Sequence, residues 1–441
     1  MLKTGYSAAI GIARRTGSLM FQHFHLRKLA LVVAALYGLP AQQRPRVVSE
    51  PGHYTFNIVA KDGQVIDGRK IIGFNTAPAA PDLPIDFAAL GPVLNNAGFV
   101  AFTAATDHGP TLFLASPTSN SFDTKAIEYP GKSVSGHNVM NVGQPAINNA
   151  NPPAVAYKVT HKSDECPQCR RNGIAIDGDL KLPGFTKISG CGRGPITEVQ
   201  SPAINDAGTY AAFVTTSDGV NCLIKGGVTV AVSQGSGSPG SQIGETRIGL
   251  ISLPAQTSLT ETGDVAFIAS QPVSISPPAQ YLCTLRACQS LPLGWGMGAH
   301  DPILNNKGQM IYSISGPQPR RATDGAIFSF VDGSHYAMND RGQVFNGWQV
   351  LDYNSASPRA NQLSPAEVER TRIDDGYRAG AIPGLPGSIL RQIVGPGSVS
   401  INNNGEVAFV VTYYESRNGL SVTHQAIVVG LPSHSGAVPG R

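Results

Sequence analysis

The sequence contains few charged residues and only one long apolar run. Asp, Glu, Lys and Arg together make up 14% of its 441 residues, whereas Gly (50) and Pro (33) are abundant. Gly and Pro interrupt long helices and are frequent in the turns between short strands. The composition therefore disfavours a helical bundle and predicts an all-β chain. One short helical insertion is expected near residues 364–372, where Ser364 and Glu367 form a capping box around Pro365.

A strong excess of either charge is also missing. Five of the 33 Lys and Arg residues, and none of the 29 Asp and Glu residues, lie in residues 1–41. The remainder is close to neutral, so it lacks the basic field with which proteins attract nucleic acid. We expect no nucleic-acid partner, no membrane span in the mature chain, and a monomer.

The familiar local signatures of catalysis and cofactor binding are absent. The sequence has no HExxH pair, no GxSxG elbow and no alternating series of acids for calcium. Gly131-Lys132-Ser133 resembles the end of a phosphate loop but lacks the leading Gly, and residues 235–241 are expected to form a flexible loop. We therefore predict no metal site and no cofactor. Glycoside hydrolysis usually needs two carboxyl groups at a defined separation. Asp301, Asp324 and Asp352 are candidates for such a pair, and nothing in the sequence favours one of them over another.

The single apolar run is part of an export signal. Arg27 and Lys28 precede the apolar residues 29–39, and Pro40-Ala41 follows them. This order is typical of a secretory signal peptide with cleavage after Ala41. The run is too short for a permanent membrane helix. Residues 1–41 are therefore interpreted as a signal peptide with Met20 as an alternative start, and the protein as secreted, periplasmic or on the cell surface.

All the cysteines follow the predicted signal. An even number of cysteines in an exported chain predicts disulfides. Cys283 and Cys288 flank a four-residue link between two strands, so a bridge across a hairpin is expected. Cys166 and Cys169 form a CxxC pair, which is expected to close on itself or to pair with Cys191 and Cys222. The alternative is a zinc site that combines the CxxC pair with Cys191 and with His161 or Cys222. The six candidates are Cys166, Cys169, Cys191, Cys222, Cys283 and Cys288.

A repeat occupies nearly all of the remaining chain. Seven times an apolar strand enters an Asn-x-x-Gly-like turn and leaves it as a second apolar strand. An Asn side chain can bond to the backbone two residues on, and Gly accepts a positive φ. Thr260 replaces the first Asn, and Asn151 replaces the Gly, in one copy each. The turn residues are Asn95 and Gly98, Asn148, Asn205 and Gly208, Thr260 and Gly263, Asn305 and Gly308, Asn339 and Gly342, and Asn402 and Gly405.

The repeat spacing indicates the architecture. Most copies are about 50 residues apart, which is the length of a four-stranded propeller blade. The interval after Asn305 is short and the next is long, so the sixth copy is interpreted as displaced or degenerate. We predict a β-propeller of about seven (six to eight) blades over residues 42–430, with a flexible tail at 431–441. The strand at 54–66 precedes the first turn and is expected to complete the last blade and close the ring. A linear solenoid is the alternative.

The repeated N-x-x-G-x-x-A-F pattern, as in Asn95–Phe102 and Asn402–Phe409, resembles bacterial tandem-repeat proteins that carry this motif. The resemblance covers roughly residues 54–430 and implies an exported β-propeller. It implies no general activity. The anchoring helix that often ends such proteins has no counterpart in the final residues of this chain.

Two functions are compatible with these features. The first is a non-enzymatic module that binds a glycan, a peptide or a protein on the face opposite the turns, where loops at 130–143 and 364–378 are expected. The second is a hydrolase or lyase acting on polysaccharide, with its site in the central channel. The densest charge cluster is the candidate ligand-binding set: Arg370, Arg372, Asp374, Asp375, Tyr377 and Arg378.

Overall fold

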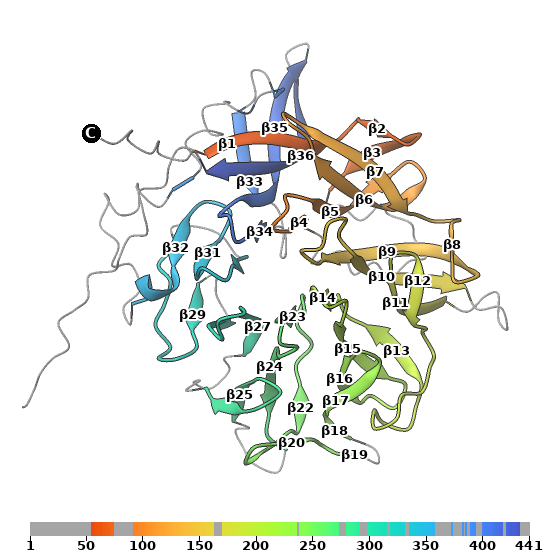
Figure 1. Cartoon of the computed structure of the whole chain (residues 1–441), viewed down its shortest axis with the longest axis vertical. Helices are drawn as coiled ribbons and strands as arrows, with labels where there is room; N and C mark the ends of the chain where they lie inside the picture. The colour runs from red at the N-terminus through yellow and green to blue at the C-terminus, as the bar shows by residue number, and fades with distance from the viewer. Residues whose placement is uncertain are drawn as a thin grey trace, which may run out of the picture. The chain divides into compact units, whose positions relative to one another are not determined.

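The described part of the computed structural model is a β-propeller whose seven blades are arranged in a ring (Figure 1). It belongs to one compact unit, Arg46–Arg441. The structure describes residues 54–74, 91–162, 170–235, 238–272, 279–291, 298–314, 318–330, 335–357, 372–373, 382, 384–385, 389–393, 399–417 and 420–432. Within these ranges no helix has the length and apolar character needed to cross a bilayer. The predicted signal, nearly all of the predicted helical insertion and residues 433–441 of the predicted tail lie outside these ranges and stay predictions. The tail prediction is wrong for Leu431 and Pro432, which belong to the strand Leu420–Pro432.

Each blade is an antiparallel sheet whose innermost strand leads into the repeated turn. In several blades that strand is split into two pieces that pair with the same neighbour. Blade 1 contains β2 (Val65–Ile66), β3 (Arg69–Gly73), β4 (Val93–Leu94), β5 (Val100–Thr106), β6 (Gly109–Pro117) and β7 (Phe122–Glu128). Blade 2 contains β8 (Ser133–Val134), β9 (His137–Ile147), β10 (Val155–Lys162), β11 (Arg170–Ile176) and β12 (Asp179–Leu182). Blade 3 contains β13 (Ile196–Val199), β14 (Ala203–Ile204), β15 (Tyr210–Thr216), β16 (Asn221–Lys225) and β17 (Val228–Val232).

Two short ribbons then precede the remaining blades. The ribbons pair β18 (Gln234–Gly235) with β19 (Ser238–Pro239) and β20 (Gln242–Ile243) with β21 (Thr246–Arg247). Blade 4 contains β22 (Leu250–Ile251), β23 (Ser258–Leu259), β24 (Val265–Ser270), β25 (Gln280–Cys283) and β26 (Cys288–Ser290). Blade 5 contains β27 (Ala299–Leu304), β28 (Met310–Ile314) and β29 (Pro319–Arg321). Blade 6 contains β30 (Ala337–Met338), β31 (Gln343–Phe345) and β32 (Val350–Asp352), and a 3-10 helix at Tyr353–Ser355 follows β32. Blade 7 contains β33 (Ile389–Ile393), β34 (Val399–Ile401), β35 (Val407–Arg417) and β36 (Leu420–Pro432).

The N-terminal strand closes the ring, as the sequence predicts. β1 (Tyr54–Lys61) pairs antiparallel with β36, from Tyr54 opposite Pro432 to Lys61 opposite Ala426. β1 is therefore the outer strand of blade 7, although it precedes blade 1 in the chain. Phe56 packs against Phe409 in the blade 7 core, while Val59 belongs to the core shared with blade 1. The predicted closed propeller is confirmed, and the solenoid alternative is wrong.

The short strands β4, β14, β23 and β34, which lead into repeated turns, lie around the middle of the ring (Figure 1). The first residue of every turn is at most 4% exposed. The Asn95 Oδ1 atom accepts the N–H groups of Ala97 and Phe99, and Gly98 has a φ of +84°. This is the predicted turn chemistry, and it recurs in the other Asn-Gly copies.

Side chains of these turns connect each blade to the next. The first-position amides donate to the first-position carbonyl of the following blade: Asn95 to Asn148, Asn148 to Asn205, Asn205 to Thr260, Asn305 to Asn339, Asn339 to Asn402 and Asn402 to Asn95. Thr260 has no amide to donate, so this series has one gap. The bond from Asn402 to Asn95 (2.9 Å) joins blade 7 to blade 1.

A second series of bonds is complete. The backbone N–H of each second-position residue donates to the second-position side chain of the next blade, and every such residue is Asn, Asp or Glu. The members in order are Asn96, Asn149, Asp206, Glu261, Asn306, Asp340, Asn403 and again Asn96. The sixth copy belongs to both series, so the interpretation of that copy as displaced or degenerate is wrong.

We expect Asn402→Ala to lower the free energy of unfolding by about 2 kcal/mol, because it leaves two partly buried backbone N–H groups, those of Asn404 and Glu406, without their acceptor. Chemical denaturation measures this change. Asn404→Ala is the matched control, because Asn404 is exposed at the third position of the same turn and its side chain makes only one exposed hydrogen bond, to the Asn96 carbonyl, so the loss should be smaller. Equal destabilisation by the two variants would contradict a structural role for the first position.

Three other expectations need correction. Asn151 does not take a positive φ, because Pro152 and Pro153 lengthen that turn and Ala154 donates to Asn148 instead. The predicted loop at 130–143 is mostly the β8–β9 hairpin, whose two-residue turn uses positive φ at Ser135 and Gly136. Within 235–241, Gly235, Ser238 and Pro239 belong to the β18–β19 ribbon rather than to a flexible loop.

The described parts of blades 5 and 6 contain three strands each. Isolated bridges join Arg320 to Ile327, Ile327 to Ser357, and Gln349 to Arg372.

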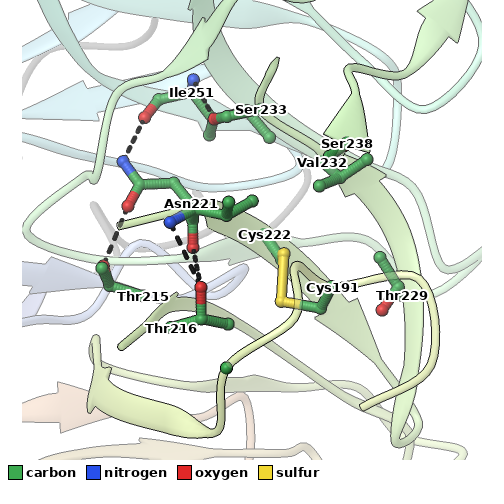
Figure 2. The surroundings of a disulfide bond; sticks show 12 residues. Cys191, Thr215, Thr216, Asn221, Cys222, Thr229, Val232, Ser233, Ser238 and Ile251 are labelled. Carbon is green, nitrogen blue, oxygen red and sulfur yellow. Dashed lines mark hydrogen bonds between the residues drawn. A yellow bond between two sulfur atoms is a disulfide. The ribbon is translucent and has the colours of Figure 1, made fainter. Parts of the chain in front are cut away.

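Two disulfides are formed. Cys283 and Cys288 bridge the β25–β26 hairpin, as predicted. Cys191, in the crossover from blade 2 to blade 3, is bonded to Cys222 of β16 (Figure 2). Both of these sulfurs belong to fully buried residues. The bond excludes the zinc alternative that used Cys191, and Cys166 and Cys169 lie outside the described residues.

Candidate functional site: a pocket in the central channel

A cavity of about 190 Å³ lies among the innermost strands of blades 4 to 7. Its lining residues precede the turn residue of their own blade by one to five positions, so they lie beside the ring of turns. The lining comprises Ala255, Gln256, Thr257, Ser258, Asp301, Pro302, Ile303, His335, Tyr336, Ala337, Met338, Val399, Ser400 and Ile401. Small-molecule sites usually measure about 300–1,000 Å³. This cavity therefore suits a small ligand or one group of a larger ligand.

Asp301 is the only acid among the described residues of this lining. The pairing register of β27 shifts between His300 and Ile303, so Asp301 lies in a β-bulge, with a φ of +47°. Its Oδ1 atom accepts the Ala255 backbone N–H (2.9 Å), and its Oδ2 atom is 2.8 Å from His300 Nδ1. Left-handed backbone at a non-glycine residue is uncommon and is concentrated at functional sites.

The carboxyl group of Asp301 is ionised at neutral pH. Burial alone raises its pKa, but the hydrogen bonds from His300 and from the Ala255 backbone lower it by more, and the pKa lies below its usual value. The same contact with Asp301 raises the pKa of His300. His300 therefore offsets part of the negative charge when it is protonated, and leaves that charge uncompensated at higher pH.

His335 and Tyr336 are neutral at neutral pH. Burial lowers the pKa of His335 to about 4, against a smaller opposing effect of the Asp301 charge. Burial also raises the pKa of Tyr336 above its usual range. The Tyr336 hydroxyl donates to Ser313 Oγ at 2.6 Å, with the Asp301 carbonyl at 3.3 Å. Both side chains therefore act in the pocket as uncharged hydrogen-bonding groups.

Most hydroxyl donors around the cavity are already used between blades. Ser258 donates to the Leu304 carbonyl (3.0 Å) and accepts the Leu304 N–H (2.9 Å). Thr257 donates to the Ser201 carbonyl at 2.6 Å, and Ser400 accepts the Leu94 N–H at 3.1 Å. A hydroxyl has only one proton to donate but two lone pairs. The donors of Ser258 and Thr257 are therefore used within the protein, while Gln256 contributes an amide that can both donate and accept.

The pocket has a sequence signal in the repeat itself. Asp301 and His335 occupy the same repeat position, four residues before the turn residue, as does Gln256. At this position in blade 2, Gln144 exchanges two hydrogen bonds with the Gly91 backbone of blade 1, and in blade 5 Asp301 accepts the Ala255 N–H of blade 4. The variation of this position from blade to blade identifies candidate ligand contacts. The residues at this position are Gly91, Gln144, Ser201, Gln256, Asp301, His335 and Ser398, of which Ser398 lies outside the described residues.

The other acids considered in the sequence have structural contacts outside the pocket. Asp324 pairs with Arg321, and Asp352 caps the 3-10 helix by accepting the Asn354 N–H. In the predicted binding cluster only Arg372 is described, in a bridge with Gln349 rather than in the pocket lining. The predicted role of that cluster stays a prediction, because its other members lie outside the described residues: Arg370, Asp374, Asp375, Tyr377 and Arg378.

Within the described ranges, no group of three or more His, Cys, Asp or Glu side chains is placed to hold a metal ion. In the pocket itself, Asp301 is close to His300 and His335, and Asp301 already accepts bonds at both oxygens. The chemistry visible here is hydrogen bonding and charge complementarity.

No protein-family model and no curated protein matches the chain, so the resemblance to the N-x-x-G-x-x-A-F repeat proteins stays a prediction. Similar solved structures include the polysaccharide lyase Uly1 (8% identity, TM-score 0.32, covering 87% of this chain and 98% of that one). The β-propeller domain of the Trilobed protease from Pyrococcus furiosus is another (8% identity, TM-score 0.31, covering 75% of this chain and 81% of that one). The Aleuria aurantia lectin AAL is a third (9% identity, TM-score 0.29, covering 79% of this chain and 97% of that one). These values are too low to support any inference about the ligand.

Proposed function

We propose that the protein is an exported, non-enzymatic binding module that takes a small group of a peptide, protein or glycan ligand into the channel pocket. The observation that carries this proposal is the set of Asp301, His335 and Tyr336 around one small cavity. Their pKa values are displaced away from neutrality, downwards for Asp301 and His335 and upwards for Tyr336. Efficient proton transfer needs a group whose pKa lies near the working pH. These three groups are better suited to holding a ligand.

The main alternative is polysaccharide cleavage in the same channel. Most glycoside hydrolases use two carboxyl groups on either side of the scissile bond. The described lining contributes one, and that one is ionised and held by two donors. The lining also has no Lys or Arg among its members to stabilise the charge that develops when an acidic sugar is cleaved. Both features support binding over cleavage.

We expect the purified, oxidised protein to bind members of a glycan or peptide array without releasing product from any polysaccharide. Asp301→Asn should weaken that binding at least tenfold, because it removes the only charge among the described lining residues. Asp324→Asn is the matched control, since the Asp324 side chain is 48% exposed and lies outside the pocket. Release of product in a reaction that Asp301→Asn abolishes would overturn the proposal.

A further inference from the structure

The charge of the channel decides what kind of group the pocket accepts, provided that the pocket binds a ligand as proposed above. Asp301 contributes a negative charge, and His335 is neutral at neutral pH. No Lys or Arg belongs to the described lining. His300 is the nearest group that can offset Asp301, and its imidazole is half exposed to solvent. The pocket therefore favours cations over anions.

The neighbouring ring of turns adds to this negative potential. Three of its second-position residues are acids: Asp206, Glu261 and Asp340. Burial raises the pKa of Glu261, and the charges of Asp206 and Asp340 raise it further against the effect of a backbone hydrogen bond. These carboxylates are thus close enough to influence each other. Lys307 and Arg341 occupy third positions in the same ring of turns and are exposed, as are Asp206 and Glu261.

The hydrogen-bonding groups and the charge of the lining distinguish between an ammonium group and a sugar as the ligand. The donors of Ser258, Thr257 and Tyr336 are used within the protein, while acceptor positions stay available. An ammonium group has three donors and no acceptor. The Asp301 carboxylate accepts such donors, and an ammonium group neutralises its charge whereas an uncharged sugar does not. The pocket therefore suits an ammonium group better than a sugar.

The remaining lining supplies an apolar environment for a hydrocarbon stem. Half of its members are apolar: Ala255, Pro302, Ile303, Ala337, Met338, Val399 and Ile401. Lysine buries its methylene chain along apolar surface and presents its charge at the end. We propose that the channel pocket binds an alkylammonium group, namely the lysine side chain of a peptide or protein partner, with Asp301 as the counter-ion.

Small probes test this proposal directly. Isothermal titration calorimetry at pH 8.5, where His300 is less protonated, compares cadaverine with mono-N-acetylcadaverine, N,N′-diacetylcadaverine, glutarate and glucose. Cadaverine should bind, and diacetylation should weaken binding at least tenfold. Asp301→Asn should weaken cadaverine binding at least tenfold, whereas Asp324→Asn should not change it. Circular dichroism and the denaturation midpoint of each variant show that it is folded.

The possible failures are distinguishable. Asp301-dependent binding of glucose or another neutral sugar, with no preference for cadaverine, would retain the channel as a binding site but overturn the lysine assignment. Failure of all probes to bind, or binding that Asp301→Asn does not change, would also overturn that assignment. Asp301-dependent release of product from a polysaccharide would overturn the proposed binding function itself.

Discussion

Deleting residues 54–61 is expected to abolish cooperative folding of the propeller. The deletion removes β1, which is the outer strand of blade 7 and pairs with β36 along almost its whole length. It also removes Phe56 and Val59 from two adjacent cores. Loss of one buried Phe side chain costs about 3–5 kcal/mol. The deletion also leaves the edge of β36 without its hydrogen-bonding partner. The summed loss of stability therefore approaches the free energy of unfolding of a typical domain, about 5–15 kcal/mol.

A rearranged chain provides the control for this deletion. Tyr54 lies opposite Pro432 in the β1–β36 pair, so residues 54–61 can be moved to follow residue 432 through a short linker. This rearranged chain should recover cooperative unfolding in guanidinium, followed by circular dichroism, while the deletion variant does not. Thr55→Ala, at an exposed position of β1, should have little effect, whereas Phe56→Ala should destabilise by about 3–5 kcal/mol. Native-like stability of the deletion variant would contradict the closure role of β1.

The sequence predicts much of this fold because its main signals are local and repeated. A turn of the Asn-x-x-Gly type is defined by four adjacent residues, and its recurrence gives the blades without knowledge of distant contacts. The closing strand follows from the same repeat, since a strand before the first copy has a partner only in the last blade. Cys283 and Cys288 flank a single hairpin, so their pairing is also local.

The pocket could not be predicted in the same way because its members come from four blades. Residue type alone does not distinguish Asp301 from Asp324 and Asp352. Asp301 differs in lying four residues before a turn, and the bulge before the fifth turn places it beside the channel. His335 approaches from the next blade. The second turn position is a different case: Asn, Asp or Glu occurs there in every copy, so the blade-to-blade bonds had a visible signal. The Asn and Gly positions that define the turn motif do not include this second position.

Removing the buried disulfide through Cys191→Ala together with Cys222→Ala should lower the free energy of unfolding by about 3.5 kcal/mol. Its cysteines are 31 residues apart, and the stabilisation by a disulfide grows with the length of the loop that it closes. Cys283→Ala together with Cys288→Ala is the matched control. Those cysteines are only 5 residues apart, so a loss of about 2 kcal/mol is expected. Equilibrium denaturation of both double variants measures the difference.

The expected loss for the Cys191/Cys222 double variant assumes that the folded structure still forms without this disulfide. The crossover that carries Cys191 has other attachments, because Asp218 accepts the backbone N–H groups of Arg193 and Gly194. The main effect of the substitution should therefore arise in the unfolded chain, which gains conformational freedom. Disulfide-reduced wild-type protein should be destabilised by at least as much as the Cys191/Cys222 double variant. A larger loss from the Cys283/Cys288 pair would show that local hairpin geometry, rather than the length of the closed loop, determines the contribution of each bond.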